Sequence, residues 1–146
     1  MKKKTTIDEN FAGLTFTNGR YKYEGDLKIN GDVVVSIDLV VSGDVVVEGN
    51  LTCYQNITAD SIIAVNVDGV DVTAENIKVS GSITAENVVG RNVAVGGTIL
   101  AGNVKVGRCY CDQLRCVNLV ADAPIHVSGD LEITGKIYAP LPAYFA

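Results

Sequence analysis

Hydrophobic residues recur at a short, regular interval over most of the chain, from Leu27 to Pro140. Cut at these residues, the segment gives 21 consecutive lines of five or six residues, the last one shorter, and no residue is skipped. Each line begins with Leu, Ile, Val or Cys, and its third residue is apolar or Gly. Residues i and i+2 of a strand lie on the same face. We therefore expect each line to be a very short strand that buries two side chains and ends in a bend.

The residues at the bends follow a rule of their own. Asp or Asn stands just before the line in 14 of the 21 cases, as at Asp26, Asn50 and Asn87. These side chains tolerate the left-handed conformation and bond to neighbouring backbone, which suits a corner. The six-residue lines usually add Gly at the fifth place, as at Gly43 and Gly97, so that the corner contains a residue without a Cβ.

Strands this short are stable only when they are stacked, and regular stacking with a bend between strands gives a β-solenoid. If three lines make one coil, the coils begin at residues 27, 45, 62, 77, 93, 109 and 125. The sequence thus predicts an all-β, three-sided, single-stranded parallel β-helix of about seven coils of 15–18 residues. At ~4.8 Å per coil, the rod would be roughly 30–35 Å long.

Two other all-β folds compete with this interpretation. An antiparallel sandwich would need longer strands and irregular loops, which the unbroken register from residue 27 to residue 137 does not provide. A four-sided pentapeptide-repeat solenoid fits the five-residue lines and the Asn residues, but not the six-residue lines at both ends.

The segments outside the repeat divide the chain into three parts. Residues 1–20 form an N-terminal tail or capping segment, residues 21–139 the solenoid, and residues 140–146 a C-terminal tail or cap. Apolar residues alternate in LTF and YKY, so this region can add strands. The open ends of a solenoid must be paired or covered. The candidate capping or assembly residues are Phe11, Leu14, Phe16, Tyr21, Tyr23, Tyr138, Leu141, Tyr144 and Phe145.

Composition narrows the function and the location. The chain has 146 residues and a net charge of −5, which disfavours nucleic acid as a partner. Lysines follow Met1 as in a signal peptide, but Asp8 and Glu9 come next and no apolar run follows. Neither a signal peptide nor a transmembrane segment is expected, so we expect a cytoplasmic protein with reduced thiols.

Three of the four cysteines lie in CYCDQLRC, residues 109–116. In the repeat, Cys109 is the first residue of its line, and Cys111, Cys116 and Cys53 are third residues, so all four should point inward as small hydrophobes. A zinc site would need four converging ligands, and the only histidine, His126, is a second residue that points outward. We expect no metal, no other cofactor and no catalytic residue.

The segment GSITAENVVGRNVAVGGTILAGNVKVG, residues 81–107, resembles the core of the bactofilins, the polymer-forming bacterial cytoskeletal proteins. Steps of Gly, a small polar residue and an aliphatic residue, such as Gly43-Asp44-Val45 and Gly129-Asp130-Leu131, extend the resemblance over roughly residues 25–139. The resemblance implies a right-handed, three-sided β-helix that joins end to end without nucleotide, flanked by short disordered tails. Here the N-terminal tail is not Pro-rich, and the C-terminal one is short and aromatic.

These observations favour a non-enzymatic structural protein that self-associates through the solenoid ends as a bactofilin-like cytoskeletal scaffold. The expected partners are further copies of the chain and, as a second class, membrane-associated or cell-envelope proteins. The alternative is an adhesin-type β-solenoid module that binds a carbohydrate or protein ligand. A hexapeptide-type acyltransferase ranks below both, because those enzymes keep six-residue lines, whereas about half of the lines here have five.

Overall fold

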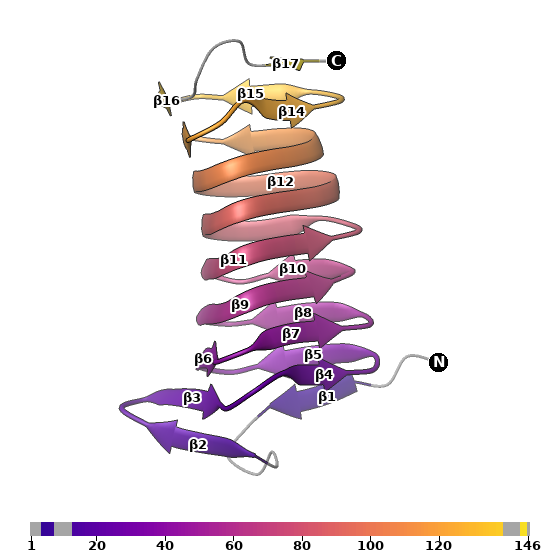
Figure 1. Cartoon of the computed structure of the whole chain (residues 1–146), viewed down its shortest axis with the longest axis vertical. Coiled ribbons are helices and arrows are strands. Elements are labelled where there is room, and N and C mark those ends of the chain that lie inside the picture. The colour runs from indigo at the N-terminus through magenta and orange to yellow at the C-terminus, as the bar shows by residue number, and fades with distance from the viewer. Residues whose placement is uncertain (1–3, 8–12, 139–143, 146) are drawn as a thin grey trace.

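The computed structural model describes residues 4–7, 13–138 and 144–145, and these residues form strands, turns and bends without a helix. Figure 1 shows flat coils stacked into a rod, with the two termini at opposite ends. The strands are β1 (Lys4–Ile7), β2 (Leu14–Thr17), β3 (Arg20–Tyr23), β4 (Leu27–Ile29), β5 (Asp32–Val35), β6 (Asp38–Val41), β7 (Asp44–Val47), β8 (Asn50–Cys53), β9 (Asn56–Ala64), β10 (Asn66–Asp68), β11 (Asp71–Val79), β12 (Ile83–Cys116), β13 (Asn118–Ala121), β14 (Ile125–Val127), β15 (Leu131–Ile133), β16 (Ile137–Tyr138) and β17 (Tyr144–Phe145). The chain is therefore the all-β solenoid that its repeat predicts.

Parallel strands stack in three ladders, which form three faces of the rod. Faces A, B and C begin their first complete coil at Leu27, Val33 and Leu39. The partners along the ladders bear out the predicted register. Along face A, Leu27 pairs with Val45, Val45 with Ile62, Ile62 with Ile77, Ile77 with Val93 and Cys109 with Ile125. Strand β12 turns its corners without an interruption and spans about two coils.

The winding is right-handed. In Figure 1 the strands on the near side, such as β9 and β11, run from left to right as the chain rises. The paler strands on the far side, such as β8 and β10, return from right to left. A chain that follows this path while rising turns in a right-handed sense.

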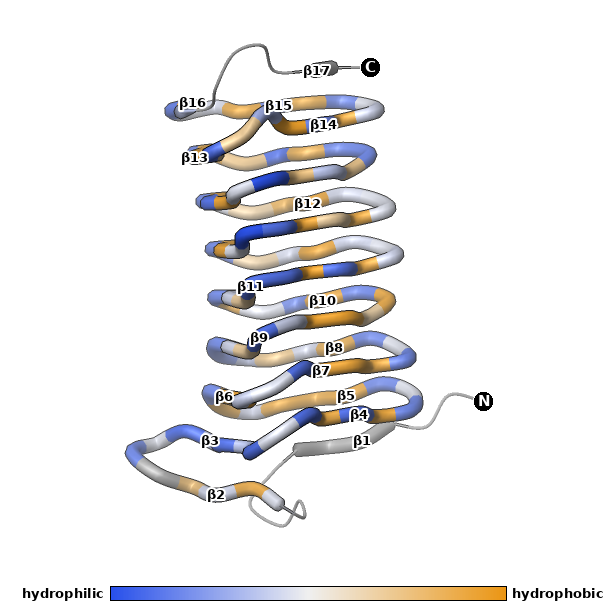
Figure 2. The backbone as a smooth tube through the Cα atoms, viewed as in Figure 1, coloured by the Kyte–Doolittle hydropathy of each residue, from blue (hydrophilic) through white to orange (hydrophobic). Residues whose placement is uncertain are grey.

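The core is a column of aliphatic side chains from the first and third residues of the lines. From Leu27 to Val127, every first residue is buried, and so are all third residues except Gly69 and Ala85, which are half-buried. No polar or charged residue in the described part of the chain is buried. Figure 2 shows the resulting alternation of hydrophobic and hydrophilic residues along the coils. Burying one Val, Leu or Ile side chain contributes about 1.5–3 kcal/mol, so stacked coils stabilise one another mainly through this column.

The Asp and Asn residues hold the corners by bonding between coils, not by adopting the left-handed conformation. Among the described residues other than glycine, only Asn18 has a positive φ, so the expectation of left-handed corners is wrong. In the first coils a carboxylate accepts from backbone one coil away: Asp26 Oδ1 accepts from the Asp44 N–H at 2.7 Å. In later coils the amides form a ladder. Asn103 Nδ2 donates to Asn87 Oδ1, and Asn118 Nδ2 donates to Asn103 Oδ1, both at 2.8 Å.

Most corner glycines are required by close stacking. A Cβ on Gly97 would lie 2.8 Å from the carbonyl oxygen of Gly81, and one on Gly135 would lie 2.7 Å from that of Val117. Both distances are too short for a carbon atom, so a side chain would force adjacent coils apart. Gly25, just before the first complete coil, and Gly31, within it, differ because their φ angles of 93° and 95° themselves favour glycine.

Candidate functional site

The N-terminal end of the rod is closed by two strands that do not belong to the repeat. Strand β1 pairs in parallel with β5 and extends face B by one strand. Strand β2 pairs antiparallel with β3, which itself stacks on β6 of face C. The turn of this hairpin consists of Asn18 and Gly19, with φ angles of 54° and 76°, a combination typical of two-residue hairpin turns. In Figure 1, β2 crosses below β3 at the N-terminal end of the rod.

Four of the predicted capping residues meet at this end. Tyr21 is buried in the core, and Leu14 and Tyr23 are half-buried against it. The ring of Phe16 contacts that of Tyr21 edge to face, with centroids 5.8 Å apart. The core of the first complete coil is buried, since Leu27, the first residue of β4, is only 3% exposed, although β4 itself pairs only with β7 within the described residues.

At the C-terminal end the parallel stacking simply stops on two of the three faces. Strand β15 pairs only with β12, and β16 pairs only with β13, within the described residues. Ile137 and Tyr138 of β16 are 56% and 64% exposed, and Leu131 of β15 is half-buried. On face A, β17 adds one strand to β14, pairing His126 with Tyr144 and Val127 with Phe145. The expected disordered tails are thus strands at residues 4–7 and 144–145.

The predicted assembly residues therefore divide between the two ends. Tyr138, Tyr144 and Phe145 lie at the C-terminal end, whereas Phe11 and Leu141 lie outside the described residues. Neither β1 nor the exposed Ile137 was predicted from the sequence. Asn18-Gly19, between two segments in which apolar residues alternate, is a strong signal for a hairpin and identifies the β2–β3 cap once it is taken into account.

The four cysteines lie in the core, as their positions in the repeat predict, and all are free thiols. Burial raises the pKa of Cys53. Burial, with the nearby Cys111 as a second cause, raises the pKa of Cys116 to about 11. A hydrogen bond from the Cys109 thiol to Cys111 raises the pKa of Cys109 and lowers that of Cys111. In the part of the chain that the structure describes, no three His, Cys, Asp or Glu side chains are arranged to hold a metal ion.

A long groove of about 850 Å³ runs along face A, parallel to the axis of the rod. One wall consists of outward second residues, among them Ile63, Lys78 and Ala94. Further along the same wall the rings of Tyr110 and His126 stack, with centroids 4.8 Å apart and an angle of 13° between them. This spacing equals that of neighbouring coils, so the stack follows directly from the register. Such a groove can hold an elongated ligand.

No family model, curated protein or solved structure matches this chain. The resemblance to the bactofilins therefore rests on the repeat pattern and on the solenoid fold. Among the described residues there is also no helix long and apolar enough to cross a membrane.

Proposed function

We propose that the protein is a non-enzymatic structural protein that self-associates through its solenoid ends, as a bactofilin-like scaffold of the cytoplasm. The observation that supports this proposal is that strands cover the two ends of the solenoid to different extents. At the N-terminal end β1 and the β2–β3 hairpin are added on faces B and C, whereas at the C-terminal end no described strand stacks on β15 or β16, and Ile137 is 56% exposed.

The C-terminal end offers both components of a stable contact. The outer edges of β15 and β16 present backbone N–H and C=O groups that can pair with another chain. Beside these edges, Ile137 continues the core column above Leu119, and Tyr138 adds apolar surface on the outside of the rod beside Val120. Two such ends can meet across a two-fold axis, so a tail-to-tail pair is the basic unit of the proposed scaffold. Membrane-associated or cell-envelope proteins would bind to the side faces of this unit.

The test is the mass of the particle in solution. Light scattering and negative-stain microscopy of the full chain should show pairs or larger assemblies, and Ile137→Asp should weaken the association at least tenfold by placing a carboxylate in the contact. Leu100→Asp is the matched control, because Leu100 is also an exposed aliphatic residue but lies on the side of the rod, and its association should be unchanged.

A full-length protein that stays monomeric at high concentration would contradict the proposal. The groove on face A would then favour the alternative, a module that binds a carbohydrate or protein ligand.

A further inference from the structure

The charges of the protein are strongly segregated along the rod. Residues 24–75 contain ten acidic residues and only one basic residue, Lys28. Residues 87–111 contain no acidic residue and three basic ones, Arg91, Lys105 and Arg108. An acidic protein therefore carries one compact region, spanning about one and a half coils, in which every formal charge is positive.

These three cations line one hollow. Arg91, Lys105 and Arg108 surround a depression of about 570 Å³ where face C turns into face A. Gly107 occupies the corner position one coil beyond Arg91, and a Cβ there would lie 2.5 Å from the Arg91 carbonyl oxygen. Gly107 therefore lets the two coils stack closely at this corner, where residues of both coils line the same hollow.

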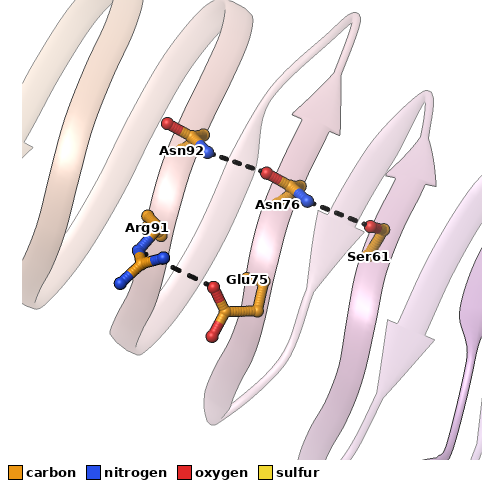
Figure 3. Close-up of polar contacts among 5 residues, drawn as sticks. All are labelled: Ser61, Glu75, Asn76, Arg91 and Asn92. Atoms are coloured by element: carbon orange, nitrogen blue, oxygen red, sulfur yellow. Dashed lines mark hydrogen bonds and ion pairs between the residues drawn. The ribbon is translucent and has the colours of Figure 1, made fainter.

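Arg108 also breaks the rule that governs its own corner. In this column Asn76 Nδ2 donates to Ser61 Oγ at 3.4 Å, and Asn92 Nδ2 donates to Asn76 Oδ1 at 2.9 Å (Figure 3). The next position along the column is Arg108, where another Asn would continue the ladder. A residue that departs from a local structural rule without improving the packing points to a functional constraint.

The cations of the hollow are poorly neutralised by the protein itself. Arg91 forms a long ion pair with Glu75, 3.8 Å between Nε and Oε2 (Figure 3). Arg115, on face B, is held by Glu132 at 3.2 Å. Among the described residues, neither Lys105 nor Arg108 forms an ion pair, and both are exposed. Among the described residues that line the hollow itself, Asp122 is the only acidic one.

We propose that this hollow binds a phosphate group. Guanidinium groups bind phosphate oxygens through paired N–H donors, and an ammonium group adds a third charge. Two arginines and one lysine around one hollow supply this donor set, while Asp122 opposes a ligand of very high charge. The phosphate belongs either to a soluble phosphate ester or to a lipid headgroup at a membrane surface. The proposal does not depend on self-association.

Binding is tested on the full chain with inorganic pyrophosphate and with two kinds of vesicle, phosphatidylcholine alone and phosphatidylcholine with phosphatidylglycerol. Arg108→Asn should weaken binding at least tenfold without destabilising the fold, because Asn occupies two other positions of this column. Arg115→Asn removes the same charge on another face and should change binding less than twofold. Asp122→Asn should strengthen binding severalfold, because it removes the opposing carboxylate.

The probes also separate the two sources of phosphate. Binding of pyrophosphate indicates a soluble ligand, and binding only to the vesicles with phosphatidylglycerol indicates a lipid headgroup; either result supports the site. The proposal would be overturned if the protein bound neither pyrophosphate nor the vesicles with phosphatidylglycerol. It would also be overturned if Arg108→Asn and Arg115→Asn weakened binding equally.

Discussion

At the N-terminal end of the rod the antiparallel strand β2 lies against β3 on face C, whereas at the C-terminal end β15 and β16 have no further strand stacked on them within the described residues. The consequence is visible in the core. Leu27 and Leu131 both begin a line in an end coil, yet Leu27 is buried and Leu131 is only half-buried. A change of strand direction thus ends the repeat on face C at one end, and at the other end the described strands of faces B and C each keep one edge without a described partner.

If the hairpin is what closes the N-terminal end, removing it should have the largest effect on the protein. Leu14→Asp places a charge against the core column, so β2 should detach and expose the edge of β3. We expect tail-to-tail pairs to grow into filaments through the newly exposed ends, as seen by negative-stain microscopy. Thr15→Asp is the control, since the neighbouring Thr15 is exposed, and it should leave the pairs intact. Pairs that remain unchanged in Leu14→Asp would show that the hairpin does not limit growth.

Truncating the two end leucines should measure how differently the ends are covered. Leu27→Ala removes a buried side chain and should lower the free energy of unfolding by about 2–5 kcal/mol. Leu131→Ala should cost about 1 kcal/mol in the dissociated protein, because this side chain is half-exposed before the change. Urea unfolding at low protein concentration gives both values. Equal losses would mean that the C-terminal end is as well covered as the other.

The interior of the solenoid was predictable from the sequence because it depends on residues two apart. The first and third positions of each line fixed the strands, the coil boundaries and the inward direction of Cys111 and Cys116, all of which the structure bears out. The ends were harder to predict. Strand β1 lies outside the repeat, and only its partner β5 determines its place. The corner ladders were missed for a related reason: each bond, such as that from Asn103 to Asn87, joins side chains 15 or 16 residues apart.

A smaller effect is expected from one of those ladders, which connect the closed end to the open one. Asn103→Ala removes the acceptor of Asn118 and the donor to Asn87, both at an exposed corner. Two exposed hydrogen bonds contribute about 1–2 kcal/mol together, so the midpoint of urea unfolding should fall modestly. Lys78→Ala, an exposed residue outside the ladders, should leave the midpoint unchanged. If Lys78→Ala lowered the midpoint of urea unfolding as much as Asn103→Ala does, the ladder would not be the cause of the lower stability.

The smallest effect on stability is expected at alkaline pH, from the buried thiol of Cys116. Because the pKa of Cys116 is raised to about 11, the unfolded chain loses this proton first as the pH rises above the ordinary thiol value. The stabilisation is complete below the unfolded pKa and decreases toward the folded pKa, by at most about 1.4 kcal/mol per pH unit. Urea unfolding at pH 8 and pH 10 should show this loss, and Cys116→Ala should reduce it. If Cys116→Ala lost as much stability between pH 8 and pH 10 as the unchanged protein, other groups would be responsible for the loss.

The hydrogen bonds between coils run parallel to the axis of the rod, because each joins a residue to its counterpart in the next coil. A tensile load spread over the C-terminal end face would therefore act on three sheets at once, and every bond of a coil would have to yield together. The same load applied to a chain terminus would meet these bonds one after another and peel the coils away in sequence. A protein joined to its neighbour through the end face should therefore resist a pulling force with all bonds of a coil at once. The same protein pulled by a chain terminus should unfold coil by coil at a lower force.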